Sequence, residues 1–342
     1  MTLRMPAEWE RQKAIWLAWP HNKEDWPGKF EPIPYVYAEI IRYLTLTQVV
    51  RLVVKNARQQ KEVAAILEQA HADLDKVDFI IAPTDRIWLR DCGPIFVYKG
   101  KERVLLDWHF NAWAKYDNWH HDDKMPARAQ KHLSLTRIQP MHKDRRVVLE
   151  GGAIDVNGKG TLLTTEECLL SKVQCRNPGF KREDYEQLFS QYFGISNVIW
   201  LGNGIVGDDT HGHVDDLARF VNPTTVVTVV EKDKSDGNFA LLRDNLKRLK
   251  SARDQNGKQL TVVELPMPKP VMFDGERLPA SYANFLIAND VVLVPTFNDA
   301  NDRIALNILA ELFPGRDVVG IYCGDFVWGL GTIHCASQQE PI

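Results

Sequence analysis

The feature that most constrains the fold is a local pattern that recurs along the whole chain. A helical stripe, a β-branched run, a polar cluster and a hairpin follow one another in the same order. The polar clusters centre on Asp91, Glu150, His213, Asn284 and Cys335, which lie 59, 63, 71 and 51 residues apart. An approximate period of this size is typical of repeat arrays and propeller-like folds. The pattern predicts an α/β protein whose units close a ring, with the polar clusters on its axis. A plain two-domain α/β protein is the alternative.

The expected elements follow the spacing of apolar residues. Apolar residues three and four apart predict helices, and short β-branched runs predict strands. The Asn157-Gly158 pair between two extended runs is the strongest hairpin signal. Helices are expected at 35–46, 57–72, 125–135, 184–193, 239–251 and 304–313. Strands are expected at 15–20, 49–54, 79–81, 95–98, 104–108, 147–149, 153–156, 161–165, 197–201, 217–221, 225–230, 260–265, 285–288, 291–295 and 318–322, and the segment after Cys335 is expected to be a polar tail.

Composition excludes several classes of function. The chain has 342 residues and a formal net charge of −3, which gives no basis for binding nucleic acid. No apolar run reaches the roughly 20 residues of a membrane helix, and the N-terminus lacks the apolar core of a signal peptide. The five cysteines are odd in number and irregularly spaced, which favours a reduced protein over a disulfide framework. We therefore expect a cytoplasmic protein with no nucleic-acid or membrane partner.

Cys335 is the candidate nucleophile. Gly329, Gly331 and His334 surround it, and glycine lets a backbone approach a ligand closely. A histidine or a cation nearby favours the reactive thiolate. A lone cysteine is more often buried and inert. The regular placement of the other polar clusters favours the catalytic interpretation, because closure of the ring would bring them to this cysteine.

Closure would gather one nucleophile, one proton-transfer group and three carboxylates. Three carboxylates suit a cationic substrate better than the oxyanion of acyl transfer, which needs donors. A planar guanidinium offers five N–H donors that carboxylates match in pairs. The thiolate would attack the guanidinium carbon, and a histidine would protonate departing ammonia and then activate water. On an extended strand, His213 and Asp215 would face the same side. The residues of this hypothesis are Cys335, His213, Glu150, Asp91 and Asp215.

A metal site is a second interpretation of the same region. Imidazole and carboxylate groups are good ligands for zinc or iron, but the spacing matches no strong metal motif, so we expect no metal. The residues that would form such a site are His211, His213, Asp208, Asp209, Asp215 and Asp216.

With these residues identified, the chain resembles the agmatine deiminase family, which also holds the bacterial-type peptidylarginine deiminases and belongs to the guanidine-modifying superfamily. The resemblance runs essentially end to end, and its motifs are highly specific when taken together. They lie at 5–9, 16–20, 88–94, 110–113, 150–152, 160–165, 168–170, 211–215, 281–285 and 331–335, with Gln338 and Gln339.

The resemblance implies a fold and a reaction. The family fold is a five-bladed, pseudo-fivefold α/β propeller (pentein) of ββαβ units with a central active site, here a single catalytic domain over residues 1–342. The implied reaction is hydrolysis of agmatine to N-carbamoylputrescine and ammonia, a step of polyamine (putrescine) metabolism. No metal or organic cofactor is implied, and a homodimer fits the family.

The resemblance also assigns roles to individual residues. Cys335 would carry a covalent amidino intermediate, and His213 would act as acid and base. Glu150 would orient the guanidinium and His213. The implied substrate-binding residues are Trp88, Asp91, Trp113, Asp215 and Gly331.

Two departures from the family pattern lie near the expected site. The terminal run reads Gly329-Leu330-Gly331-Thr332 where the family usually has Gly-Gly-Gly-Asn, and Ala114 and Lys115 stand where glycine is usual. These changes bear on substrate preference more than on reaction type. Deimination of free arginine or peptidyl-arginine, amidino transfer to an amine, and a non-catalytic guanidine- or polyamine-binding module stay open. No arginine stands out as a clamp for an α-carboxylate, which disfavours free arginine.

Overall fold

The computed structural model describes residues 3–342 and contains five sheets built on one strand pattern. In each of them an antiparallel pair is followed by a helix, and the next strand returns parallel to the second strand of the pair. In four of the five sheets this is also the order along the chain, ββαβ, in agreement with the recurring pattern in the sequence. In the fifth sheet the first strand of the pair comes last in the sequence, and a second helix and strand are added. The first of these sheets joins the two ends of the chain, because the C-terminal strand pairs antiparallel with the first long N-terminal strand.

The strands group by sheet as follows. The sheet that joins the chain ends contains, in spatial order, β21 (Ser337–Pro341), β2 (Gln12–Ala18), β3 (Val49–Val54) and β4 (Val77–Ile81). The next contains β1 (Leu3–Arg4), β5 (Ile95–Lys99), β6 (Glu102–Leu106) and β7 (Thr136–Ile138). The other three contain β10 (Asp155–Val156), β11 (Thr161–Thr165) and β12 (Asn197–Leu201); β13 (Ala218–Asn222), β14 (Thr225–Val230) and β15 (Thr261–Pro266); and β18 (Leu286–Ile287), β19 (Val291–Thr296) and β20 (Asp317–Tyr322). Two short hairpins are β8 (Met141–His142) with β9 (Arg145–Arg146), and β16 (Met272–Phe273) with β17 (Glu276–Arg277).

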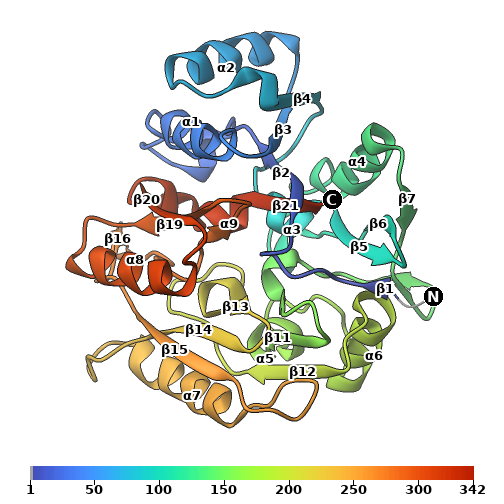
Figure 1. Cartoon of the computed structure of the whole chain (residues 1–342), viewed down its shortest axis with the longest axis vertical. Helices are drawn as coiled ribbons and strands as arrows, with labels where there is room; N and C mark the ends of the chain where they lie inside the picture. Colours follow the sequence, from blue (N-terminus) through green and yellow to red (C-terminus); the bar gives the residue numbers. More distant parts are fainter. Residues whose placement is uncertain (1–2) are drawn as a thin grey trace.

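The helices are of two kinds. The longer ones are α1 (Ile33–Leu44), α2 (Ala57–Gln69), α4 (Met125–Leu133), α6 (Arg182–Phe193), α7 (Asn238–Ser251) and α8 (Ala300–Leu312). The short ones are α3 (Leu89–Cys92), α5 (Glu166–Leu170) and α9 (Ile333–Ala336), with the 3₁₀ turns η1 (Lys23–Asp25), η2 (Leu74–Lys76), η3 (Ala112–Ala114), η4 (Asp122–Lys124), η5 (Gly151–Ala153), η6 (Val214–Asp216) and η7 (Phe326–Gly329). In Figure 1, α4, α6, α7 and α8 lie toward the rim, and α3 and α9 lie near the middle.

Each long helix that follows a hairpin packs against its own sheet and against a neighbouring sheet. Helix α7 contacts β14 and β12, α8 contacts β20 and β15, and α1 contacts β3 and β20. Helix α6 contacts β1 of the preceding sheet. In α4, His132 Nε2 lies 2.7 Å from an oxygen of Asp78, which belongs to β4. The contacts therefore pass from sheet to sheet and return to the one that joins the chain ends.

Local sequence explains where these elements begin and end. Helix α1 has Pro34 in its first turn, where the missing N–H costs nothing, and it buries Tyr37, Ile41 and Leu44 on one face. A capping box of Asp299 and Asp302 starts α8. The strands β11 and β14 are buried along their whole length, as expected for strands covered on both faces.

Two sequence predictions were wrong. The segment after Cys335 is not a polar tail: it is the buried strand β21. Its polar side chains find partners there, as when Trp16 Nε1 donates to Glu340 Oε2 at 3.0 Å. Residues 147–149 do not form a regular strand, because only a single bridge joins Val148 to His109.

Candidate active site

The polar clusters meet because their residues lie in or next to short helices and 3₁₀ turns that contact one another. Asp91 lies in α3, Glu150 caps η5, and His213 caps η6. Asp215 lies within η6, and Cys335 lies in α9. Helix α3 contacts both α9 and η5, and η5 contacts η6. The structure thus brings the five predicted residues to one region, although they span most of the chain.

Cys335 is buried and surrounded by acidic groups. Its side chain is 5% exposed, and its Sγ donates to Asp215 Oδ2 at 3.6 Å. Asn284 Nδ2 donates to the same sulfur at 3.0 Å. Burial, together with the negative charges of Asp215, Asp216 and Asp91, raises the pKa of the Cys335 thiol well above its usual range. The free protein therefore holds a thiol at neutral pH.

Asp91 connects several parts of the site. Its Oδ2 accepts from Trp113 Nε1 at 2.9 Å, and its Oδ1 accepts from the backbone N–H of Gly152 at 3.1 Å. The same Oδ1 lies 3.7 Å from His213 Nδ1. Burial raises the pKa of Asp91 to about 6, because the low-polarity surroundings penalise the charged form more than His213 favours it.

His213 and Glu150 carry unused polar atoms. Both side chains are fully buried. Within residues 3–342, neither ring nitrogen of His213 has a hydrogen-bond partner, and neither has Glu150 Oε2. Glu150 Oε1 accepts from Arg176 Nε at 2.9 Å. Burial opposes protonation of His213, but the charges and contacts of Asp91, Cys168 and Asp215 together outweigh it and raise the pKa of His213 well above its usual value. Buried polar atoms without partners are costly, so this arrangement suits a site that a polar ligand completes.

Asp215 is fixed by a second histidine. His334 Nδ1 lies 2.7 Å from Asp215 Oδ2, and His334 Nε2 lies 2.8 Å from Glu8 Oε2. Glu8 also accepts from Arg219 Nη2 at 2.6 Å. Burial would raise the pKa of Asp215, but the bond to His334 lowers it. Both nitrogens of His334 are committed to carboxylates, so this histidine positions Asp215.

Asn284 fixes the segment that carries Cys335. Its Oδ1 accepts from Thr332 Oγ1 at 2.7 Å and from the backbone N–H of Cys335 at 3.3 Å. Its Nδ2 donates to Asp216 Oδ1 and to Cys335 Sγ, at 3.0 Å each. Sequence analysis located this residue only approximately, as the centre of one polar cluster.

The predicted strand geometry around His213 was wrong. His213 has φ −59° and ψ 136° and caps the 3₁₀ turn that contains Asp215, so the two residues do not alternate along an extended strand. Both still reach the site, because the turn contributes to it from successive positions. Asp208 Oδ2 accepts from the backbone N–H of Gly212 at 2.8 Å and of His213 at 2.9 Å and so holds this turn.

A narrow pocket opens next to Cys335. Trp88 stacks on Phe326, with ring centroids 5.9 Å apart, and packs against Gly331. A Cβ atom on Gly331 would come within 2.9 Å of the Trp88 ring, so only glycine fits there. The lining residues are Arg86, Trp88, Asp91, Trp113, Asp209, Thr210, Gly329, Leu330, Gly331 and Cys335. The pocket thus contains seven residues that sequence analysis linked to the cysteine site or to its departures from the family: Trp88, Asp91, Trp113, Gly329, Leu330, Gly331 and Cys335.

The pocket continues outward into a larger, open hollow. Arg86, Asp209, Gly329 and Leu330 line both spaces and so mark the mouth between them. Arg86 lies at this mouth, and the sequence analysis did not name it as a clamp for an α-carboxylate. Its Nη1 donates to Asp25 Oδ1 at 2.8 Å, so part of its charge is already paired.

Two groups of buried side chains could bind a metal ion by their donor types. In each, the donor atoms lie within 4.8 Å of one another: Glu150, Cys168 and His213 in one, and Asp215, Asp216 and Cys335 in the other. The set suggested by the sequence around His211 is not gathered. His211 Nε2 lies 3.0 Å from Ser171 Oγ, while His213 faces Glu150 and Cys168.

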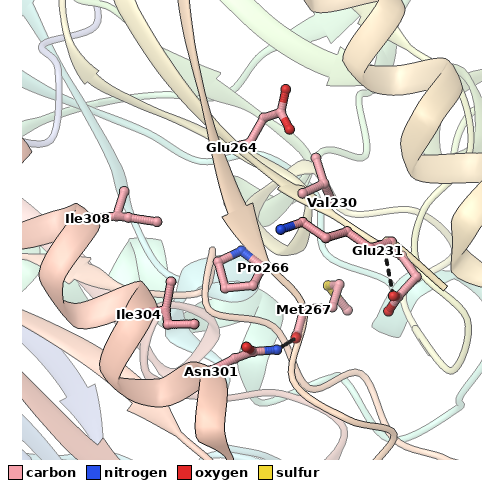
Figure 2. A pocket seen from close by; sticks show the side chains of 9 residues that line it. Val230, Glu231, Glu264, Pro266, Met267, Asn301, Ile304 and Ile308 are labelled. Atoms are coloured by element: carbon pink, nitrogen blue, oxygen red, sulfur yellow. Dashed lines mark hydrogen bonds between the residues drawn. The ribbon is translucent and has the colours of Figure 1, made fainter.

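A separate groove between β15 and α8 carries none of this chemistry (Figure 2). The apolar side chains of Ile304 and Ile308 on α8 face it. It is lined by Val230, Glu231, Lys232, Glu264, Pro266, Met267, Asn301, Ile304 and Ile308, with no cysteine or histidine among them.

Comparison with known proteins identifies the family. Residues 4–341 match the model of the Porphyromonas-type peptidyl-arginine deiminases. The chain belongs to this family. An agmatine deiminase from Ectopseudomonas mendocina (strain ymp) is 34% identical to it, over 98% of this chain and 95% of that protein.

Solved structures of the family have the same α/β fold. The agmatine deiminase of Enterococcus faecalis superposes with a TM-score of 0.90 at 32% identity, over 99% of this chain and 96% of that one. A cysteine-to-serine variant of C. jejuni agmatine deiminase with substrate bound gives 0.88 at 29% identity, over 99% and 96%. An amidinotransferase from Microseira wollei shares the fold alone, at a TM-score of 0.52 and 13% identity, over 98% and 96%.

Within residues 3–342, each helix is too short or too polar to cross a membrane.

Proposed function

We propose that this protein hydrolyses agmatine to N-carbamoylputrescine and ammonia through a covalent intermediate on Cys335. The observation that carries the proposal is the pocket above Cys335, whose base gathers one thiol, one unpartnered histidine and several buried carboxylates. Buried carboxylates without enough cations nearby are unfavourable, and a planar guanidinium supplies both the charge and the N–H donors they lack. The family contains proteins named as agmatine deiminases, which supports agmatine as the substrate.

Binding of the guanidinium would complete the unfinished contacts of the site. Asp91 and Asp215 would accept its N–H donors, with Asp215 Oδ1 and Glu150 Oε2 as free acceptors in the described structure. Trp88 and Trp113 flank the aliphatic part of the substrate, and Gly331 leaves the space that it needs.

Substrate binding would also activate the nucleophile. Negative charges hold Cys335 as a thiol in the free protein. A guanidinium beside the sulfur offsets those charges and favours the thiolate. The proton leaves to a neighbouring base, and Asn284 Nδ2 keeps its hydrogen bond to the sulfur as the negative charge develops.

The chemical steps follow from the arrangement. The thiolate of Cys335 forms a bond to the guanidinium carbon, His213 donates a proton to one nitrogen, and the carbon–nitrogen bond breaks to release ammonia. His213, now neutral, takes a proton from water, and the resulting hydroxide attacks the same carbon. The carbon–sulfur bond then breaks as the hydroxyl proton on that carbon passes to solvent, which releases the neutral urea group of the product and the thiolate. Asp91, 3.7 Å from His213 Nδ1, stabilises the protonated ring.

We propose Asp209 as the partner of the distal amine of agmatine. Asp91 and Asp209 are the carboxylates among the residues that line the pocket, one at its base and one at its mouth. Arg86 at the same mouth could favour the α-carboxylate of free arginine, but Asp25 already pairs with it. The geometry therefore favours agmatine over arginine, and peptidyl-arginine would have to extend into the outer hollow.

We also propose that residues 1–342 form one catalytic domain, a closed five-bladed α/β propeller. The helix contacts that pass from each sheet to the next, and the pairing of β21 with β2, support closure. The five unpaired cysteines, among them the proposed nucleophile, support a reducing compartment such as the cytoplasm. A homodimer stays a prediction from the family resemblance.

Steady-state ammonia release tests the function. We expect turnover of agmatine, much weaker turnover of free arginine and of a peptidyl-arginine, and loss of several orders of magnitude in Cys335→Ser with binding retained. Equal or better turnover of arginine would overturn the agmatine assignment. Transfer of the amidino group to an added amine in place of hydrolysis would reassign the reaction, and binding without turnover would indicate a binding module.

A further inference from the structure

The mouth of the pocket holds a cation that belongs to the protein itself. Lys115 Nζ forms an ion pair with one oxygen of Asp209. Tyr116 Oη donates to the other oxygen at 2.8 Å. Both oxygens of Asp209 are therefore occupied. The Asp209 side chain is 15% exposed and that of Lys115 is 41% exposed, so water reaches the pair.

Lys115 presents the same chemical group as the far end of agmatine. Each consists of four methylenes that end in a primary ammonium. If the guanidinium lies at Asp91, the ammonium of agmatine needs a carboxylate at the mouth, and Asp209 is the carboxylate there. The substrate and the lysine therefore compete for one partner.

The conformation of the loop before Lys115 fixes where the lysine lies. Ala112, Trp113 and Ala114 have φ values of 49°, 59° and 54°, an unusual left-handed run for residues other than glycine. The Asn111 side chain accepts from the backbone N–H of Ala114 at 2.9 Å.

Two contacts anchor the same loop to the pocket wall. Trp113 Nε1 donates to Asp91 at 2.9 Å. Gln174 Nε2 donates to the carbonyls of Trp113, at 3.2 Å, and Asp209, at 3.0 Å. The side chain of Gln174 thus joins the backbone of the loop that carries Lys115 to the backbone of Asp209. This contact holds the two residues near each other, so their ion pair forms with little further ordering.

We propose that Lys115 is a built-in competitor for the amine end of the substrate and so determines the affinity of the pocket for agmatine. This inference rests on the proposed function. Because the lysine residue lies at the mouth and not at the reacting carbon, it affects substrate affinity and leaves the chemical step alone. A guanidine without a distal amine does not need Asp209 and escapes the competition.

The test compares two substrates in matched variants. Agmatine carries the amine, and n-butylguanidine has the same chain without it. In Lys115→Ala we expect the KM for agmatine to fall about two- to fivefold, the range that an ion pair of this exposure supports. The KM for n-butylguanidine and both kcat values stay within twofold. Lys115→Arg keeps the ion pair and a wild-type KM, and Lys101→Ala, at an exposed turn, is the surface control. Calorimetry in the Cys335→Ser background reads the same affinities without turnover.

Two outcomes would overturn the inference while the proposed function stands. One is an unchanged or higher KM for agmatine in Lys115→Ala. The other is an equal fall for both substrates, which would mean that the lysine merely narrows the mouth. A wild-type protein that hydrolyses neither guanidine would instead overturn the proposed function, and the inference with it.

Discussion

Asn284 offers a test of how the nucleophile is held. Its side chain is 1% exposed and makes hydrogen bonds to four groups of the site: the Cys335 sulfur, the Cys335 backbone, the Asp216 carboxyl and the Thr332 hydroxyl. Asn284→Ala removes all of them. The backbone N–H of Cys335, the Asp216 carboxyl and the Thr332 hydroxyl would then be buried without a partner from this side chain. Each of these three groups costs about 1–2 kcal/mol, so we expect the free energy of unfolding to fall by about 3–6 kcal/mol.

The same substitution has a separate effect on catalysis. A hydrogen bond to a charged group is worth about 1.5–3 kcal/mol, and the bond from Asn284 Nδ2 matters most when the sulfur is a thiolate. We expect kcat for agmatine to fall about 10- to 100-fold. Urea unfolding measures the first effect, and ammonia release from the folded variant measures the second.

A matched variant separates the two effects. Asn245 is also fully buried, but it bonds to the backbone of Gly202 and Asn203, beyond the pocket lining. Asn245→Ala should lose stability and keep its kcat. A folded Asn284→Ala protein with wild-type kcat would refute the role of this amide at the sulfur.

Two further predictions concern the base of the pocket. Asp91 must be ionised to bind a guanidinium, and its pKa is raised to about 6, so kcat/KM for agmatine should fall as pH drops below about 6; a flat profile down to pH 4 would contradict this assignment. A Cβ atom on Gly152 would lie 2.5 Å from His213 Nδ1 and 2.8 Å from Asp91 Oδ1. Gly152→Ala should therefore lower kcat/KM at least about 100-fold, while Gly315→Ala, which meets no atom within 4 Å, keeps it. Circular dichroism confirms that both variants fold, and full activity in Gly152→Ala would refute the crowded geometry.

The sequence predicted the repeating elements because they depend on local pattern. Hairpin turns such as Asn157-Gly158 and the apolar face of α1 are visible within a short window. The strand β21 was missed, because its polar residues become buried only by pairing with β2 at the other end of the chain. No local pattern specifies a partner that lies more than 300 residues away.

In the candidate site, too, the sequence predicted the residues with a local signal and missed the long-range contacts. The five residues Cys335, His213, Glu150, Asp91 and Asp215 were named from the sequence, because their types and period are visible there. The contacts that hold these five residues were not predicted. His334, which the sequence analysis noted only as a neighbour of Cys335, contacts both Asp215 and Glu8, and Glu8 lies 326 residues away from it in the chain.

The signals for these partners were present but could not be assigned. Glu8 lies in the motif at 5–9, and Asn284 in the motif at 281–285. Arg176, which bonds to Glu150, lies in no motif that the sequence analysis used. Only the three-dimensional structure shows which buried polar group each of these side chains bonds to.

The most direct test of the account is mass spectrometry of the protein quenched during agmatine turnover. The account predicts an amidino adduct, agmatine less ammonia, on the peptide that contains Cys335, with N-carbamoylputrescine as the released product. The adduct should be absent from Cys335→Ser and should disappear when agmatine is exhausted. Turnover of agmatine at the wild-type rate in Cys335→Ser, or an adduct confined to another residue, would contradict the covalent mechanism.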